Sequence, residues 1–74
     1  MKKTAVSEIH AKPGQCDIRL GYFRRKSGTH TVALYWPFHE QEIPDCWNFE
    51  RIEDARVKFA ALRKWLASKG YVKQ

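Results

Sequence analysis

The sequence predicts a single α+β domain in which a small antiparallel sheet of three or four strands packs against one C-terminal helix. Apolar side chains recur at every second residue through 16–26 and 29–38, as they do in half-buried strands. After residue 50 the apolar spacing changes to three and four residues, which is typical of one face of a helix. A chain of 74 residues has room for one core only.

Residues 1–14 are expected to be a flexible arm or an edge strand, and residues 15–74 to form the domain. Lys12-Pro13-Gly14 is a turn signal that separates the two. Within the first segment, residues 5–9 are the stretch best suited to an edge strand.

A β-hairpin is predicted next, because Lys26-Ser27-Gly28 provides a glycine-containing turn between the two alternating segments. β-Branched and aromatic residues dominate the second segment, 29–38, and these residue types favour strands. Ile18, Leu20 and Tyr22 are expected to share one face of the first strand, and Val32, Leu34 and Trp36 one face of the second.

The segment after the hairpin is predicted to be irregular. Pro37 is expected to end the second strand, because proline cannot donate a backbone hydrogen bond. Residues 39–45 are expected to form a polar loop closed by Pro44, followed by a short third strand at 46–50 that carries Trp47 and Phe49 on one face.

The C-terminal helix has the clearest local signal. Gly70 suits the left-handed position after the helix, and Tyr71 would then contact Leu66 in a Schellman cap. The apolar stripe of the helix consists of Ile52, Ala55, Phe59, Leu62 and Leu66.

A net charge of +6 and an isoelectric point of about 9.6 indicate a polyanionic partner, most often DNA or RNA. The basic residues cluster at the hairpin, where they are interleaved with aromatic residues. This combination can neutralise phosphates and stack on bases. The predicted nucleic-acid-binding residues are Arg19, Tyr22, Phe23, Arg24, Arg25 and Lys26.

A second hypothesis is a protein–protein adaptor or inhibitor, such as a phage or plasmid accessory factor that acts on a host protein. It is based on the acidic side chains between the hairpin and the helix, with exposed aromatic residues beside them. The interface would consist of Phe38, Glu40, Glu42, Asp45 and Trp47.

No catalytic motif stands out, so the chain is not expected to be an enzyme, and no cofactor is predicted. Cys16, His30, His39 and Cys46 are of the right types for zinc, but none of them is paired at the two-to-four-residue spacing of structural sites. No apolar signal segment follows Met1-Lys2-Lys3, and no stretch is long enough for a membrane span. We therefore expect a cytoplasmic protein that does not enter a membrane and whose two cysteines are free.

Several residues of the C-terminal half resemble the WGR domain in order and spacing: Phe49, Ile52-Glu53-Asp54-Ala55, Phe59, Leu62 and Lys69-Gly70-Tyr71. The resemblance covers the chain from Ile18 onward and implies two or three strands, a loop, another strand and a helix. It also implies nucleic-acid binding and contacts with neighbouring domains. The Trp-Gly-Arg signature itself is replaced by Trp36-Pro37-Phe38.

Overall fold

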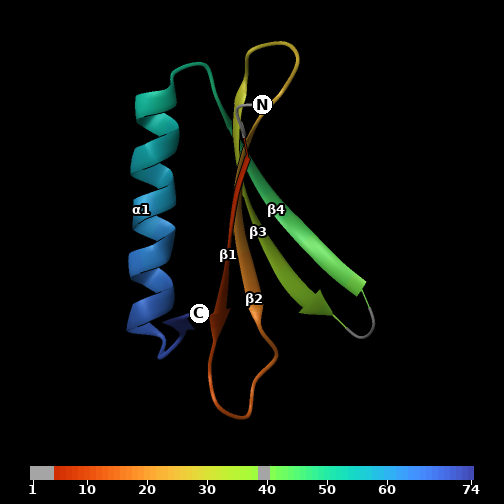
Figure 1. Cartoon of the computed structure of the whole chain (residues 1–74), viewed down its shortest axis with the longest axis vertical. Coiled ribbons are helices and arrows are strands. Elements are labelled where there is room, and N and C mark those ends of the chain that lie inside the picture. Colours follow the sequence, from red (N-terminus) through yellow and green to blue (C-terminus); the bar gives the residue numbers. More distant parts are fainter. Residues whose placement is uncertain (1–4, 39–40) are drawn as a thin grey trace.

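The computed structural model describes residues 5–38 and 41–74, which form a five-stranded antiparallel sheet with one helix against it (Figure 1). The elements are β1 (Ala5–Ala11), β2 (Ile18–Arg24), β3 (His30–Phe38), β4 (Gln41–Phe49), α1 (Ile52–Ser68) and β5 (Val72–Lys73). The strand order across the sheet is β4-β3-β2-β1-β5. The predicted α+β class is confirmed, and the sheet gains a short strand, β5, that the sequence pattern does not reveal.

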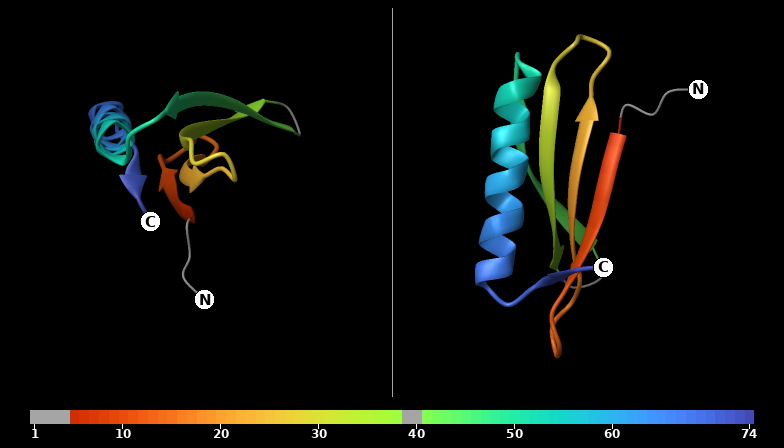
Figure 2. Two further views of the ribbon diagram at one scale, coloured as in Figure 1. Left: turned by 90° about the horizontal axis from the view of Figure 1, so that it is seen from above. Right: turned by 60° about the vertical axis from the view of Figure 1, so that its left-hand side comes forward.

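Helix α1 lies along one face of the sheet, where it contacts β2, β3 and β4 (Figures 1 and 2). Strand alternation sends every second side chain toward the helix, as predicted for the hairpin. The buried core between the two layers consists of Ile18, Leu20, Val32, Leu34, Ala55, Leu62 and Leu66. No other element of the described chain covers the opposite face of the sheet.

The region around the two prolines differs from the prediction. Strand β3 continues through Pro37 to Phe38, and the expected polar loop at 39–45 is largely the first half of β4. Pairing between β2 and β3 ends at Tyr35, so the missing N–H of Pro37 leaves no bond unmade on the β2 side. Pro44 lies in β4, an edge strand, where proline is tolerated. Backbone pairing along β3 therefore outweighs both proline signals.

The C-terminal end of α1 has the predicted Schellman cap. The Tyr71 N–H donates to the Leu66 carbonyl at 3.0 Å, and the Gly70 N–H donates to the Ala67 carbonyl at 3.1 Å. Gly70 has a φ of 92°, a conformation that strains any residue with a Cβ atom. The cap reverses the chain, so that β5 can pair with His10 and Ala11 of β1.

The buried carboxylate of Glu8 connects β1 to α1 and β5. Arg63 of α1 donates to both carboxylate oxygens, through Nε to Oε1 at 3.2 Å and through Nη2 to Oε2. His10 Nε2 lies 3.1 Å from Oε1, and Lys73 Nζ of β5 lies 3.4 Å from Oε2. Glu8 and His10 are only 7% and 2% exposed, so this polar cluster closes the edge of the core.

The surroundings of Glu8 also set its ionisation. Burial alone would raise the pKa of Glu8, but hydrogen bonds from Arg63 and His10 and the charges of Arg63 and Lys73 outweigh burial and hold this pKa below its usual value. The same contact raises the pKa of Arg63. A carboxyl group whose pKa is lowered by folding stabilises the fold above its unfolded-state pKa, and this contribution is lost as the pH falls through its folded-state pKa.

Replacing Leu66, which has no exposed surface, tests the core between helix and sheet. Leu66→Ala should lower the free energy of unfolding by about 2–5 kcal/mol in urea denaturation, because it leaves a cavity among buried side chains. The control Lys64→Ala, at an exposed position on the same helix, should change it by less than about 0.5 kcal/mol. Equal midpoints for the two variants would contradict this packing.

Replacing Glu8 tests the polar cluster. Glu8→Gln should lower the free energy of unfolding by about 1–3 kcal/mol at neutral pH, because it weakens charge-assisted hydrogen bonds at a buried site. The difference from the wild type should close as the pH falls below 4.5, the usual pKa, since the wild-type carboxylate is then being protonated. Glu53→Gln, whose side chain is 63% exposed, is the control. A constant difference down to low pH would show that the charge of Glu8 is not what stabilises the fold.

Candidate nucleic-acid interface

The sheet face opposite α1 carries most of the predicted binding residues, and we call it the open face. Its members follow from the cross-strand register, because directly paired residues point to the same side of a sheet. The described side chains and small residues of the open face are those of Ala5, Ser7, Ile9, Arg19, Gly21, Phe23, Thr31, Ala33, Tyr35, Cys46 and Asn48.

Two arginine–aromatic pairs lie on the open face. The Arg19 guanidinium carbon is 4.2 Å from the centroid of the Tyr35 ring, and that of Arg25 is 5.3 Å from the Phe23 ring. Phe23 lies four residues beyond Arg19 on β2, so the two pairs are about 13 Å apart along the strand. Cation–π contacts of this kind hold each guanidinium group in place over its ring.

The hairpin turn fixes the position of Arg25. The Arg25 N–H donates to the Thr29 carbonyl at 2.8 Å, and the Gly28 N–H donates to the Arg25 carbonyl at 2.9 Å. The side chain of Arg25 then donates from Nε to Thr31 Oγ1 at 3.0 Å, and the Thr31 hydroxyl donates to Asn48 Oδ1 at 2.7 Å. A continuous chain of hydrogen bonds therefore runs from the turn to β4 across the open face.

Small residues occupy the middle of the open face. Gly21 is paired with Ala33, and Ala33 is paired with Cys46. A Cβ atom at position 21 would lie 3.6 Å from the Tyr35 ring, so this ring leans across the glycine. Gly21 and Ala33 are buried, so neighbouring side chains cover the centre of the face between the two arginine–aromatic pairs.

The structure divides the six predicted binding residues. Arg19, Phe23 and Arg25 lie on or over the open face, and Lys26 is exposed in the hairpin turn beside it. Arg24 is exposed too, but it is paired with His30 and therefore points to the same side of the sheet as Tyr22.

Tyr22 lies on the opposite, helix-covered side of the sheet. Its hydroxyl is 2.7 Å from His30 Nδ1, and the two rings stack with their centroids 5.9 Å apart. Tyr22 and Phe23 were both predicted to pack or stack beside the basic residues, and they lie on opposite faces of the sheet because adjacent residues of a strand alternate. Sequence reasoning also missed Thr31, Tyr35 and Asn48, whose roles depend on strand pairing.

The described residues of the alternative protein interface serve internal contacts. Asp45 accepts a hydrogen bond from Trp36 Nε1 at 2.7 Å. Trp47 packs against the core and lies beneath Lys58, whose Nζ is 4.3 Å from the ring centroid. Glu40 and the side chains of Phe38 and Glu42 lie outside the described part of the structure.

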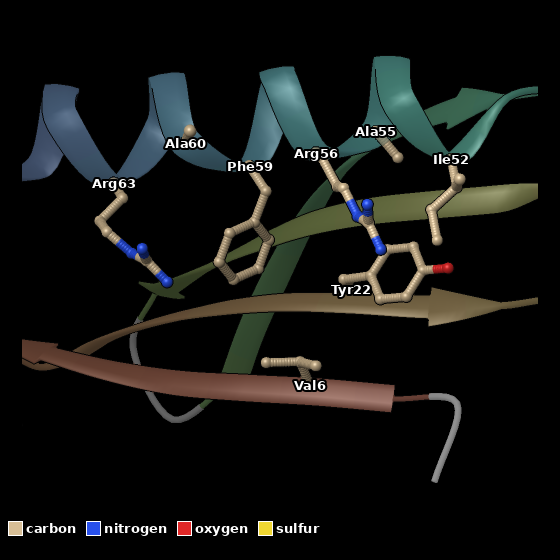
Figure 3. A pocket seen from close by; sticks show the side chains of 8 residues that line it. All are labelled: Val6, Tyr22, Ile52, Ala55, Arg56, Phe59, Ala60 and Arg63. Carbon is tan, nitrogen blue, oxygen red and sulfur yellow. The ribbon is translucent and has the colours of Figure 1, made fainter. Parts of the chain in front are cut away.

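A separate groove lies between α1 and the strands β1 and β2 (Figure 3). Its volume is about 300 Å³, at the lower end of the range for small-molecule sites. Tyr22 and Val6 form the sheet side, and Phe59 reaches down from the helix between Arg56 and Arg63. Arg63, which lines the groove, also makes the polar contact with Glu8 that joins β1 to the helix. No sequence signal indicated the groove.

Cys16 and Cys46 are both exposed free thiols. His39, one of the four residues weighed for zinc, lies outside the described residues. Within 5–38 and 41–74, no group of three His, Cys, Asp or Glu side chains is placed to hold a metal ion. The described helix is too short or too polar to cross a membrane.

The chain matches no protein-family model, and neither a curated protein nor a solved structure is significantly similar to it. Its function must therefore be inferred from the chemistry of its own surfaces, of which the open face carries two arginine–aromatic pairs.

Proposed function

We propose that the protein is a nucleic-acid-binding module, not an enzyme, and that it binds through the open face and the adjoining hairpin turn. Arg25 and Lys26 contact phosphates, and the Arg19–Tyr35 and Arg25–Phe23 pairs form the stacking part of the surface. The observation that carries the proposal is the presence of two arginine–aromatic pairs on one uncovered sheet face.

The pairs suit nucleic acid because each arginine is already positioned before the ligand arrives. A guanidinium group that stacks on a ring still presents its outer plane, and unpaired bases stack on such planes. Arg25 loses little conformational freedom on binding, since Thr31 and Phe23 already hold its side chain. These contacts favour single-stranded DNA or RNA, whose bases are accessible.

The charge distribution supports the same surface. None of the described side chains on the open face is acidic. Glu8 points to the helix side, where Arg63 and Lys73 neutralise it, and Glu53 and Asp54 lie in the first turn of α1. An excess of positive charge on one face attracts a polyanion and orients it there.

The resemblance to the WGR domain is consistent with this proposal, because that family is linked to nucleic-acid binding. The Trp-Gly-Arg signature is absent, and in this chain Trp36 packs against the helix-facing core. The arginines proposed for binding are instead those of β2 and its turn.

The proposal predicts a charge-specific change in salt dependence. Arg25→Ala with Lys26→Ala should reduce the log–log salt slope for a single-stranded oligonucleotide by about 1.4, since each phosphate contact contributes about 0.7. Fluorescence anisotropy at several salt concentrations measures this slope.

The matched control removes the same charge from the helix, as Arg56→Ala with Lys64→Ala, and should leave the slope nearly unchanged. The same slope loss in both double variants would mean that only net charge matters and that the open face is not the site. No binding of single strands or duplexes at low salt would reject nucleic acid as the partner and favour the protein-adaptor hypothesis.

A further inference from the structure

Helix α1 carries a second apolar stripe that the sheet does not cover. It consists of Val57, Ala61 and Trp65, spaced four residues apart and therefore aligned along one side of the helix, and we call it the outer stripe. Val57 is 70% exposed and Trp65 is 41% exposed. The core uses a different side of the helix, through Ala55, Leu62 and Leu66.

A hollow lies next to one end of the outer stripe. It has a volume of about 430 Å³ and lies where α1 passes the end of β4. Most of its lining is apolar, and the lining residues are Phe49, Asp54, Val57, Lys58 and Ala61. The hollow is large enough to receive an indole ring, and Trp65 cannot fill it from within the same helix because it lies eight residues, about 12 Å, beyond Val57.

Trp65 projects from the other end of the stripe in a fixed orientation. Its ring packs edge-on against Trp36, with the centroids 5.6 Å apart and the planes at 80°. One helix therefore presents a partly exposed ring, a small residue and a hollow in sequence. We propose that the outer stripe is the interface of a two-fold symmetric dimer, in which Trp65 of each copy enters the hollow of the other.

Antiparallel pairing of two α1 helices satisfies this geometry. With Ala61 of both copies at the two-fold axis, Trp65 of one copy lies opposite Val57 of the other. Both contacts form at once, as an isologous interface requires. The small side chain of Ala61 at the crossing point allows the two helix axes to approach to about 8–10 Å, the spacing that is typical of packed helices.

The charges at the two ends of the helix favour antiparallel over parallel pairing of two copies. Glu53 and Asp54 lie in the first turn of α1, and Lys69 follows its last residue. Antiparallel pairing puts the acidic end of each helix beside the basic end of the other, whereas parallel pairing would put like charges together. The helix dipoles are also opposed in the antiparallel arrangement. The dimer leaves the open face uncovered, so it does not depend on the proposed nucleic-acid binding.

Analytical ultracentrifugation of the full chain over a range of concentrations tests the dimer. The wild type should sediment as a dimer, and Ala61→Glu should weaken dimerisation at least tenfold, because two carboxylates would meet at the axis. Ala60→Glu is the matched control, since its neighbouring exposed position lies outside the outer stripe, and it should remain a dimer. Circular dichroism would check that both variants are folded.

Cross-linking provides a second readout in case both glutamate variants dissociate. In a Cys16→Ser/Cys46→Ser background, Ala61→Cys should form a disulfide between two chains under mild oxidation, and Ala60→Cys should not. A wild type that stays monomeric up to about 1 mM would overturn the proposal. So would a dimer that survives Ala61→Glu, or one that cross-links equally well through positions 60 and 61.

Discussion

A single helix covers a single face of this sheet, and the rest of the structure follows from that constraint. Side chains that alternate toward α1 form the apolar core, while those that alternate away have no second layer of the described chain over them. Thr31 and Ala33 on that face are buried by neighbouring side chains instead. The open face is instead ordered by its own side chains, through the Arg19–Tyr35 and Arg25–Phe23 pairs and the Thr31–Asn48 hydrogen bond. The contacts that keep this face ordered are the same ones on which the proposed nucleic-acid binding depends.

The helix is too narrow to pack on all five strands, and the two sides of the sheet meet this limit in different ways. On the β1 side, Glu8 reaches Arg63 through a polar contact, and an apolar groove remains above Val6 and Tyr22. On the β4 side, aromatic rings meet the helix, and the outer stripe stays exposed beyond them. Both unfilled regions are therefore consequences of the same incomplete coverage.

Local patterns in the sequence were sufficient to predict the elements whose determining residues lie within a few residues of one another. The helix, its Schellman cap and the β2–β3 hairpin were predictable because apolar spacing and Gly70 specify them directly. The extension of β3 and β4 through Pro37 and Pro44 was not predictable. It depends on whether a neighbouring strand would accept a hydrogen bond at each proline position, which the sequence does not show. The contacts of Glu8 were not predictable either, because its partners other than His10 are 55 or more residues away in the sequence. Nor was the role of Asn48, which contacts Thr31 only across the sheet.

The two native cysteines offer the most direct test of the open face as a binding surface. Cys46 lies on that face, paired with Ala33, whereas Cys16 is exposed in the connection between β1 and β2. Alkylation rates of both thiols, followed by mass spectrometry with and without a single-stranded oligonucleotide, would compare the two sites within one molecule. The account predicts that bound oligonucleotide slows the reaction of Cys46 and leaves that of Cys16 unchanged. Unchanged rates at both thiols under conditions of saturated binding would contradict it.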